Sequence, residues 1–157
     1  MPNIYAGFMA LGSLLLDEGG QQVSITPRSW MNGVYFSEFR RALLARLGID
    51  SIHTFRSRSE VFGDLGVLQE TIIVSVTRGV APTTVRLSSS VDHREAPVTR
   101  TVPYSQVVTG DFIFVPASDE DGVAVSWMER ARCALADLGL SVSTGRVVDF
   151  RSRDLLR

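Results

Sequence analysis

Thr26-Pro-Arg-Ser-Trp-Met-Asn-Gly33 is the first of two polar loops on which the fold of this chain depends. The second is Arg56-Ser-Arg-Ser-Glu-Val-Phe62, which continues to Val67-Leu-Gln-Glu70. Each loop follows a short apolar segment that is typical of a strand. Ligands of open α/β sheets bind at loops that follow the carboxyl ends of strands. We therefore expect an α/β fold in which these two loops form a ligand site.

The residues before the first loop predict one helix and one strand. Asn3 can cap a helix over about residues 4–17. Apolar side chains recur in it at helical spacing and form one stripe, made of Ile4, Phe8, Leu11 and Leu15. Gly19-Gly20 supplies the stop after this helix. Val23 and Ile25 then alternate with polar neighbours in a short strand, which Pro27 ends because it lacks a backbone N–H donor.

The rest of the sheet is predicted from alternating helical and strand-like segments. A helix over about 35–47 should carry Arg40, Arg41 and Arg46 largely away from its apolar stripe, and Gly48 should end it. The next two strands, over 49–55 and 70–76, are joined by a loop too short for a crossover helix, so they should be antiparallel. A further strand is expected over 84–88. Residues 90–110 are expected to form a linker or irregular connection, followed by a buried strand or extended segment at Phe112–Val115 and a terminal helix over 123–138.

The composition is that of a globular protein. The 157 residues are 45% hydrophobic and 21% charged, which suits one domain or part of a larger one. A net charge of −1 gives no broad basic surface for nucleic acid, and one cysteine excludes an internal disulfide framework. All 16 basic residues are Arg, which codon bias or selection for bidentate phosphate contacts would explain. Without a signal pattern or an apolar run of about 18–20 residues, we expect a soluble, cytoplasmic protein with no membrane partner.

Signals for metal binding and for catalysis are poor. His53 falls in a predicted strand and His93 in the expected connection, and neither has further ligands at the spacing of a metal site. No serine lies in a Gly-x-Ser-x-Gly elbow. We therefore assign no catalytic, cofactor-binding or metal-ligating residue to this chain.

Binding is better supported, although each loop has two interpretations. The first loop could be a rigid turn covered by Trp30, or it could hold Arg28 and Asn32 at the rim of the sheet for base edges or phosphate oxygens. In the second loop, Phe62 could be a core anchor. An Arg-rich loop with one aromatic side chain also suits base stacking, which is worth about 1–3 kcal/mol per base. The candidate binding residues are Pro27, Arg28, Asn32, Arg56, Arg58 and Phe62.

A set of short blocks, spread over residues 3–153, carries a family resemblance. The blocks are Asn3-Ile-Tyr-Ala-Gly-Phe8, Ile25-Thr-Pro-Arg-Ser29, Asn32-Gly33, Tyr35-Phe36, Phe39-Arg40, Ile52-His53, Phe55, Ser57-Arg58, Val61-Phe62, Val67-Leu-Gln-Glu70, Leu138-Gly-Leu140, Val142-Ser-Thr-Gly145 and Val147-Val-Asp-Phe-Arg151. In this order and spacing they resemble adenine-specific DNA methyltransferases of restriction–modification systems. The most similar subgroup combines methylation and restriction in one polypeptide.

The resemblance implies a fold and a reaction. The fold is the C-terminal half of a Rossmann-like methyltransferase sheet, which ends in an antiparallel hairpin formed by Ile49–Phe55 and Glu70–Val76. Such enzymes transfer a methyl group from S-adenosylmethionine to the exocyclic amine of an adenine that is flipped out of DNA. By resemblance, Phe62 stacks on the flipped base, and Pro27 and Arg28 line the same pocket.

Two elements of that family are absent from this sequence, namely the glycine-containing cofactor loop and the Asn/Asp-Pro-Pro-Tyr/Phe tetrapeptide. We therefore expect a fragment that is inactive alone, with residues 1–89 as the second half of the methyltransferase-like domain. Residues 90–157 should be a linker, strand and helix that lead towards an absent target-recognition domain. The expected partners are DNA and either the missing N-terminal half or a second copy, through an exposed sheet edge. The alternative is a non-enzymatic nucleic-acid- or protein-binding α/β module derived from such an enzyme.

Overall fold

The computed structural model describes residues 3–57, 70–79, 81–116, 133 and 135–141. The chain divides into two compact units, Met1–Gly122 and Val123–Arg157. In the second unit, the described residues include the short 3-10 helix η5 (Leu135–Leu138). The expected terminal helix over 123–138 therefore lies largely outside the described residues.

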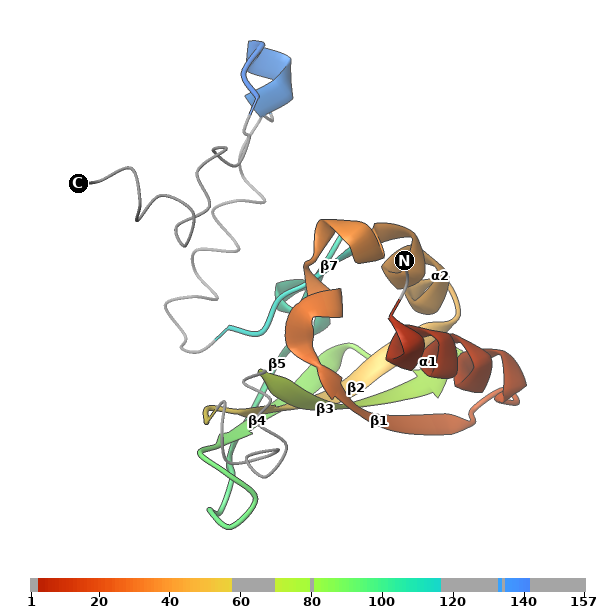
Figure 1. The fold of residues 1–157 in the computed structure, drawn as a ribbon, viewed down its shortest axis with the longest axis vertical. Coiled ribbons are helices and arrows are strands. Elements are labelled where there is room, and N and C mark those ends of the chain that lie inside the picture. The colour runs from red at the N-terminus through yellow and green to blue at the C-terminus, as the bar shows by residue number, and fades with distance from the viewer. Residues whose placement is uncertain (1–2, 58–69, 80, 117–132, 134, 142–157) are drawn as a thin grey trace, which may run out of the picture. The chain divides into compact units, whose positions relative to one another are not determined.

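The first unit contains a five-stranded mixed sheet with α1 and α2 on one of its faces (Figure 1). Its helices are α1 (Ile4–Leu15), η1 (Arg28–Met31), η2 (Val34–Phe36), α2 (Ser37–Leu44) and η4 (Tyr104–Gln106). The strands of the sheet are β1 (Gln21–Pro27), β2 (Leu47–Phe55), β3 (Thr71–Arg78), β4 (Thr84–Ser90) and β5 (Val98–Pro103). A separate two-stranded ribbon is formed by β6 (Val108–Thr109) and β7 (Phe112–Ile113). This architecture confirms the expected α/β fold class.

The strand directions bring several carboxyl ends to one edge of the sheet. The strand order is β1-β3-β2-β4-β5. Strands β1 and β2 both pair antiparallel with β3, so the expected β2–β3 hairpin is confirmed, and β4 pairs parallel with β2. Strands β1, β2 and β4 therefore run in the same direction. The loops that follow them meet at the same edge.

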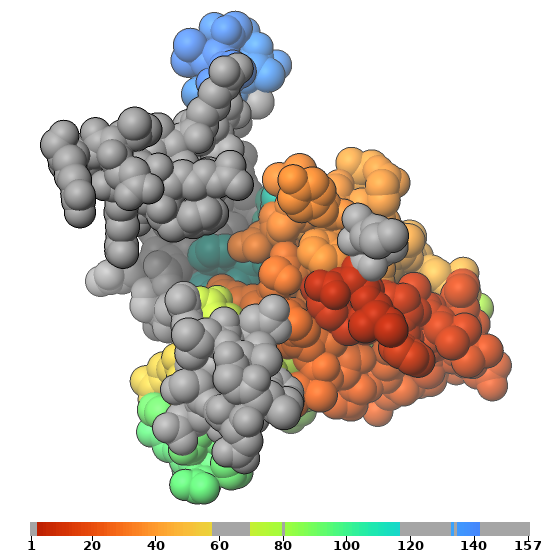
Figure 2. Space-filling model, in the orientation of Figure 1, coloured from red at the N-terminus to blue at the C-terminus, as the bar shows by residue number. Residues whose placement is uncertain are grey.

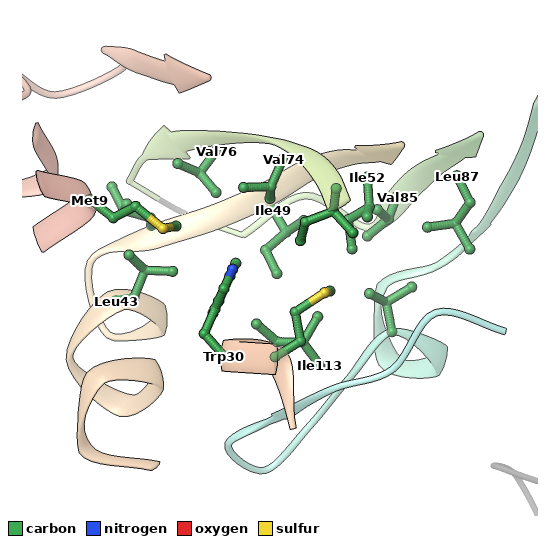
Figure 3. Close-up of a cluster of buried hydrophobic side chains, with 14 of the residues drawn as sticks. Met9, Trp30, Leu43, Ile49, Ile52, Val74, Val76, Val85, Leu87 and Ile113 are labelled. Atoms are coloured by element: carbon green, nitrogen blue, oxygen red, sulfur yellow. The ribbon is translucent and has the colours of Figure 1, made fainter. Parts of the chain in front are cut away.

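One hydrophobic core lies between the sheet and the helices (Figure 3). The indole of Trp30 points from η1 towards the sheet side chains, with Leu43 of α2 on one side and Ile113 of β7 on the other. Trp30 is fully buried, and its Nε1–H donates to Thr26 Oγ1 at 3.0 Å. Phe39 packs against the same indole edge-on, with ring centroids 5.7 Å apart. The loop after β1 is thus anchored in the core by its aromatic residue.

The apolar stripe of α1 does not face this core. Phe8 is 69% exposed and Ile4 is 77% exposed, whereas Ala6, Met9 and Ser13 are buried. The helix therefore packs on the fold through Ala6, Met9 and Ser13, and its larger apolar stripe lies outside. Neither α1 nor any other helix in the described part of the chain has the length and apolar character of a membrane span.

Helix α2 is shorter than the sequence predicted, because Leu47 and Gly48 already belong to β2. Gly48 is therefore not a helix stop. A Cβ at this position would lie 2.7 Å from both Ala81 Cα and Pro82 Cδ, so glycine is required by the close approach of the chain there. Arg40, which was expected on an outer face of the helix, is buried instead.

The expected irregular connection over 90–110 is wrong in its second half. Residues Val98–Pro103 form β5, which pairs antiparallel with β4 and places Arg100 opposite Leu87. Because β5 is an edge strand, Pro103 at its end removes no inner hydrogen bond from the sheet. The expected strand at Phe112–Val115 is limited to β7. The boundary expected after residue 89 falls within β4, and the role assigned to residues 90–157 stays a prediction.

Candidate functional site

A concave site of about 480 Å³ lies at the edge of the sheet where β1, β2 and β4 end. Its walls also include the first residues of β3 and β5 and residues 115–116. This volume is within the roughly 300–1,000 Å³ of small-molecule sites. Its position is the one that the sequence predicted for a ligand of an open α/β sheet.

The first loop contributes Arg28 to this site. Pro27 is the last residue of β1, opposite Thr71, and the chain then leaves the sheet through η1, as its missing N–H donor predicted. Arg28 donates its backbone N–H to the Glu70 carbonyl at 2.8 Å, and its Nη1 lies 3.6 Å from the Glu70 carboxylate. Asn32 is exposed and does not line the site. Of the three candidates in this loop, only Arg28 reaches the concave surface.

The second loop contributes Arg56, which directly follows β2. Its Nη2 lies 3.2 Å from the Glu95 carboxylate, and both side chains are largely exposed. Surface ion pairs of this kind contribute about 0–1 kcal/mol, so a phosphate or base acceptor can replace the carboxylate at little cost. Arg58 and Phe62 lie outside the described residues, and their roles stay predictions.

Several lining residues were missed at the level of sequence because β5 was not predicted. Arg100 from β5 lines the site and donates Nη2 to the Pro116 carbonyl. Ser88 and Ser89 of β4 add polar groups to the wall formed by the β4–β5 pair. Apolar side chains of β2 to β5 and the Glu70 carboxylate complete the lining. The arrangement suits a ligand with an apolar face and polar or negatively charged edges, because three guanidinium groups and one carboxylate lie on largely apolar walls.

His53 does not line the concave site, although it lies in the same strand as its neighbour Thr54. The Ser90 hydroxyl donates to the Asp92 carbonyl at 2.6 Å, so it accepts from His53 Nε2 at 3.2 Å. His53 Nδ1 then accepts from the Ser88 hydroxyl at 2.8 Å. Burial lowers the pKa of His53, which favours this neutral form. Both ring nitrogens are thus engaged in linking β2 to β4, as expected of a structural histidine.

The glycine turn of the described residues does not have the form of a cofactor loop. The only adjacent glycine pair among them, Gly19-Gly20, forms the turn between α1 and β1, where Gly19 has a φ of 75°. That turn is closed by backbone hydrogen bonds between Gly19 N–H and Arg78 O at 3.0 Å and between Arg78 N–H and Gly20 O at 2.9 Å. The Gly20 N–H donates to Asp17 O at 2.8 Å, so both amides of the glycine pair are occupied within the fold. The described residues also contain no cluster of three potential metal ligands.

Comparison with known proteins agrees with the fold and with the resemblance of the sequence. The Eco57I restriction-modification methylase family matches residues 1–62. Over 98% of its length, the chain is 38% identical to the type II methyltransferase M.PstI of Providencia stuartii, and over 99% it is 35% identical to M.BsuBI of Bacillus subtilis.

The same fold occurs in a solved structure, that of the type IIG restriction endonuclease BpuSI. The TM-score is 0.55 at 15% identity, over 98% of this chain and 21% of that one. The chain spans 32% of the length of each of the two curated relatives. The chain is therefore similar to type II methyltransferases over nearly all of its own length, and to the restriction-modification methylase family over residues 1–62.

Proposed function

We propose that this chain is part of a DNA methyltransferase of a restriction–modification system, which modifies the exocyclic amine of adenine. The observation that carries the proposal is the concave site at the carboxyl ends of β1, β2 and β4, with Arg28 and Arg56 on its walls. This site would receive the adenine after it is flipped out of the duplex, a step that costs a few kcal/mol and is offset by contacts in the pocket. The relatives support the methyltransferase class.

The cofactor of the complete enzyme would be S-adenosylmethionine, which supplies the methyl group. The Gly19-Gly20 turn does not offer free amides to it, so we assign no step through the cofactor to this chain. The chain would contribute binding and orientation of the adenine, by Arg28, Arg56 and, from outside the described residues, Arg58 and Phe62. We propose that the chain does not methylate DNA alone. We expect it to act in the cytoplasm.

The remainder of the enzyme would dock on the surface formed by α1 and β1. The α1 residues Ile4 and Phe8 are exposed, and Figure 2 shows the surface of α1 open to solvent. Strand β1 is an edge strand of the sheet, and its Val23 and Ile25 are exposed on the face opposite to Gln22 and Thr26, which contact the helices. An unpaired edge beside large apolar side chains is the type of surface that pairs with another strand and is covered by another element. The missing N-terminal half is the proposed occupant, and self-association is the alternative.

A binding assay tests the proposed site. The probe is a fluorescent duplex with one adenine opposite an abasic position, compared with the fully paired duplex. Phe62→Ala should weaken binding to the unpaired adenine by about 1–3 kcal/mol through lost stacking. Arg56→Ala should weaken it by up to a similar amount.

Arg86→Ala is the matched control, because Arg86 is exposed on β4 and does not line the site. It should leave the affinity almost unchanged. Equal affinity for the two duplexes, or equal losses in the Arg56 and Arg86 variants, would contradict the proposal. If Phe62→Ala still prefers the duplex with the unpaired adenine to the fully paired duplex as strongly as the unsubstituted chain does, Phe62 belongs to the core and not to the site.

A further inference from the structure

Arg40 joins two parts of the fold that are far apart in sequence. Its side chain is 1% exposed. On one side, Nη1 donates to the Trp30 carbonyl at 2.9 Å and to the Gly33 carbonyl at 2.6 Å. On the other side, Nε donates to the Asp111 carbonyl, and Nη2 lies 3.3 Å from Asp111 Oδ2. One guanidinium therefore binds the loop after β1 and the turn of the β6–β7 ribbon at the same time.

These two segments lead to different walls of the concave site. Trp30 belongs to η1, which begins with the lining residue Arg28. Asp111 lies in the ribbon that precedes the lining residues Val115 and Pro116. Arg40 thus links the segments that lead to both walls, although it does not itself line the site.

The neighbours of Arg40 hold its guanidinium in one position, unlike a surface side chain. The ring of Phe112 lies over the guanidinium, 5.2 Å from ring centroid to Cζ. The Ser37 hydroxyl donates to Asp111 Oδ2 at 2.6 Å, and this hydrogen bond, with the nearby Arg40, lowers the pKa of Asp111. A planar guanidinium can donate in several fixed directions at once, which an ammonium on a flexible stem cannot reproduce.

We propose that Arg40 is a positioning residue that sets the separation between the Arg28 wall and the Val115–Pro116 wall, and thereby the width of the binding site. What the site binds rests on the proposed function. The effect of Arg40 on the two walls does not, because its contacts with Trp30, Gly33 and Asp111 involve no ligand.

Hydrogen exchange on the 157-residue chain tests the placement without DNA. Two amides report on the two walls, namely Gly33 N–H, which donates to Ser29 O at 3.0 Å, and Phe114 N–H, which donates to Val107 O at 2.6 Å. In Arg40→Met both should exchange about tenfold faster or more relative to the amides of β2 and β3, as the loss of one or two hydrogen bonds implies. Arg40→Lys should show the same pattern, because lysine keeps the positive charge but lacks the several fixed donor directions of the guanidinium.

The control is Leu43→Ala, because Leu43 is buried on the same helix and belongs to the core. It should accelerate exchange by a common factor across the sheet and both walls. If Arg40→Met behaves in the same way, Arg40 stabilises the fold as a whole and the proposal is wrong. If exchange is faster at only one of the two amides, Arg40 does not hold both walls, and the proposal is also wrong.

Binding to the duplex with an unpaired adenine then connects the placement to function. We expect Arg40→Lys to bind this probe about tenfold more weakly than Leu43→Ala, both measured where each variant is fully folded. Equal affinities of the two variants would show that Arg40 does not influence binding at the concave site. If the unsubstituted chain does not discriminate the unpaired adenine, the proposed function fails, and the exchange result still decides whether Arg40 sets the spacing of the walls.

Discussion

Replacement of Trp30 should show how strongly the core holds the loop that carries Arg28. Trp30 is fully buried, and its Nε1–H donates to Thr26 Oγ1 at 3.0 Å. Truncation of a buried Trp to Ala typically costs about 3–5 kcal/mol. Trp30→Phe keeps a ring but leaves the buried Thr26 hydroxyl without this donor, which adds about 1–3 kcal/mol to the cost of the smaller ring. Measured by urea denaturation, the free energy of unfolding should be highest for the unsubstituted chain, lower for Trp30→Phe and lowest for Trp30→Ala.

The hydrogen bond itself can be separated from the packing by a double-mutant cycle with Trp30→Phe and Thr26→Val. We expect a coupling energy of about 0.5–1.5 kcal/mol, the usual net value of such a bond. Tyr35→Ala is the control, because Tyr35 is 100% exposed and its loss should change stability by no more than about 0.5 kcal/mol. A cost below about 1 kcal/mol for Trp30→Ala would refute the anchoring of the loop in the core. A coupling energy of zero would refute the contribution of the hydrogen bond.

Two further predictions concern the sheet. Gly48→Ala should destabilise the protein by about 1–3 kcal/mol, because the new Cβ would meet Ala81 Cα and Pro82 Cδ at 2.7 Å, and thermal unfolding should show the loss. Gly7→Ala, where the structure has nothing within 4 Å of the new Cβ, should instead raise stability by about 0.5–1 kcal/mol, and equal shifts in the two variants would contradict the packing at Gly48. Burial lowers the pKa of His53 below its ordinary 6.5, so folding stability should be full above that pH and decline as the pH falls through it. Melting temperatures between pH 7.5 and 5 should show a smaller decline in His53→Asn, and identical profiles would exclude His53 as the cause.

Local sequence patterns predicted most elements correctly but not what covers them. The spacing of Ile4 and Phe8 identified α1, because apolar residues at helical period favour a helix. The same spacing cannot say whether the stripe meets the core or another polypeptide. In the structure, the stripe is exposed.

Features that depend on distant partners were beyond sequence reasoning. Arg40 was expected on another face of its helix than the apolar stripe, whereas the structure buries it, and its partner Asp111 lies 71 residues further on. Gly48 was interpreted as a helix stop, whereas its reason is the approach of Ala81. Strand β5 was missed because Pro97 precedes it and Pro103 is its last residue, and prolines are tolerated at the ends of edge strands.

The candidate site was predicted in its location and only in part in its residues. Arg28 and Arg56 were identified because each directly follows a predicted strand, and both line the concave site. Asn32 is on the same loop, but it lies beyond η1 and does not reach the site. Arg100 could be found only once β5 was known, since its place opposite Leu87 results from pairing between strands.

Methyl transfer in a reconstituted mixture is the most direct test of the central claim, that this chain supplies one part of an adenine methyltransferase. The chain is incubated with adenine-containing duplex and labelled S-adenosylmethionine, with and without a separate polypeptide that carries the glycine-containing cofactor loop and the Pro-Pro tetrapeptide. The products are identified as methylated nucleosides by mass. We predict methylation of the adenine amine only when both polypeptides are present. Methylation by this chain alone, or a mixture that neither associates nor methylates adenine, would contradict the account.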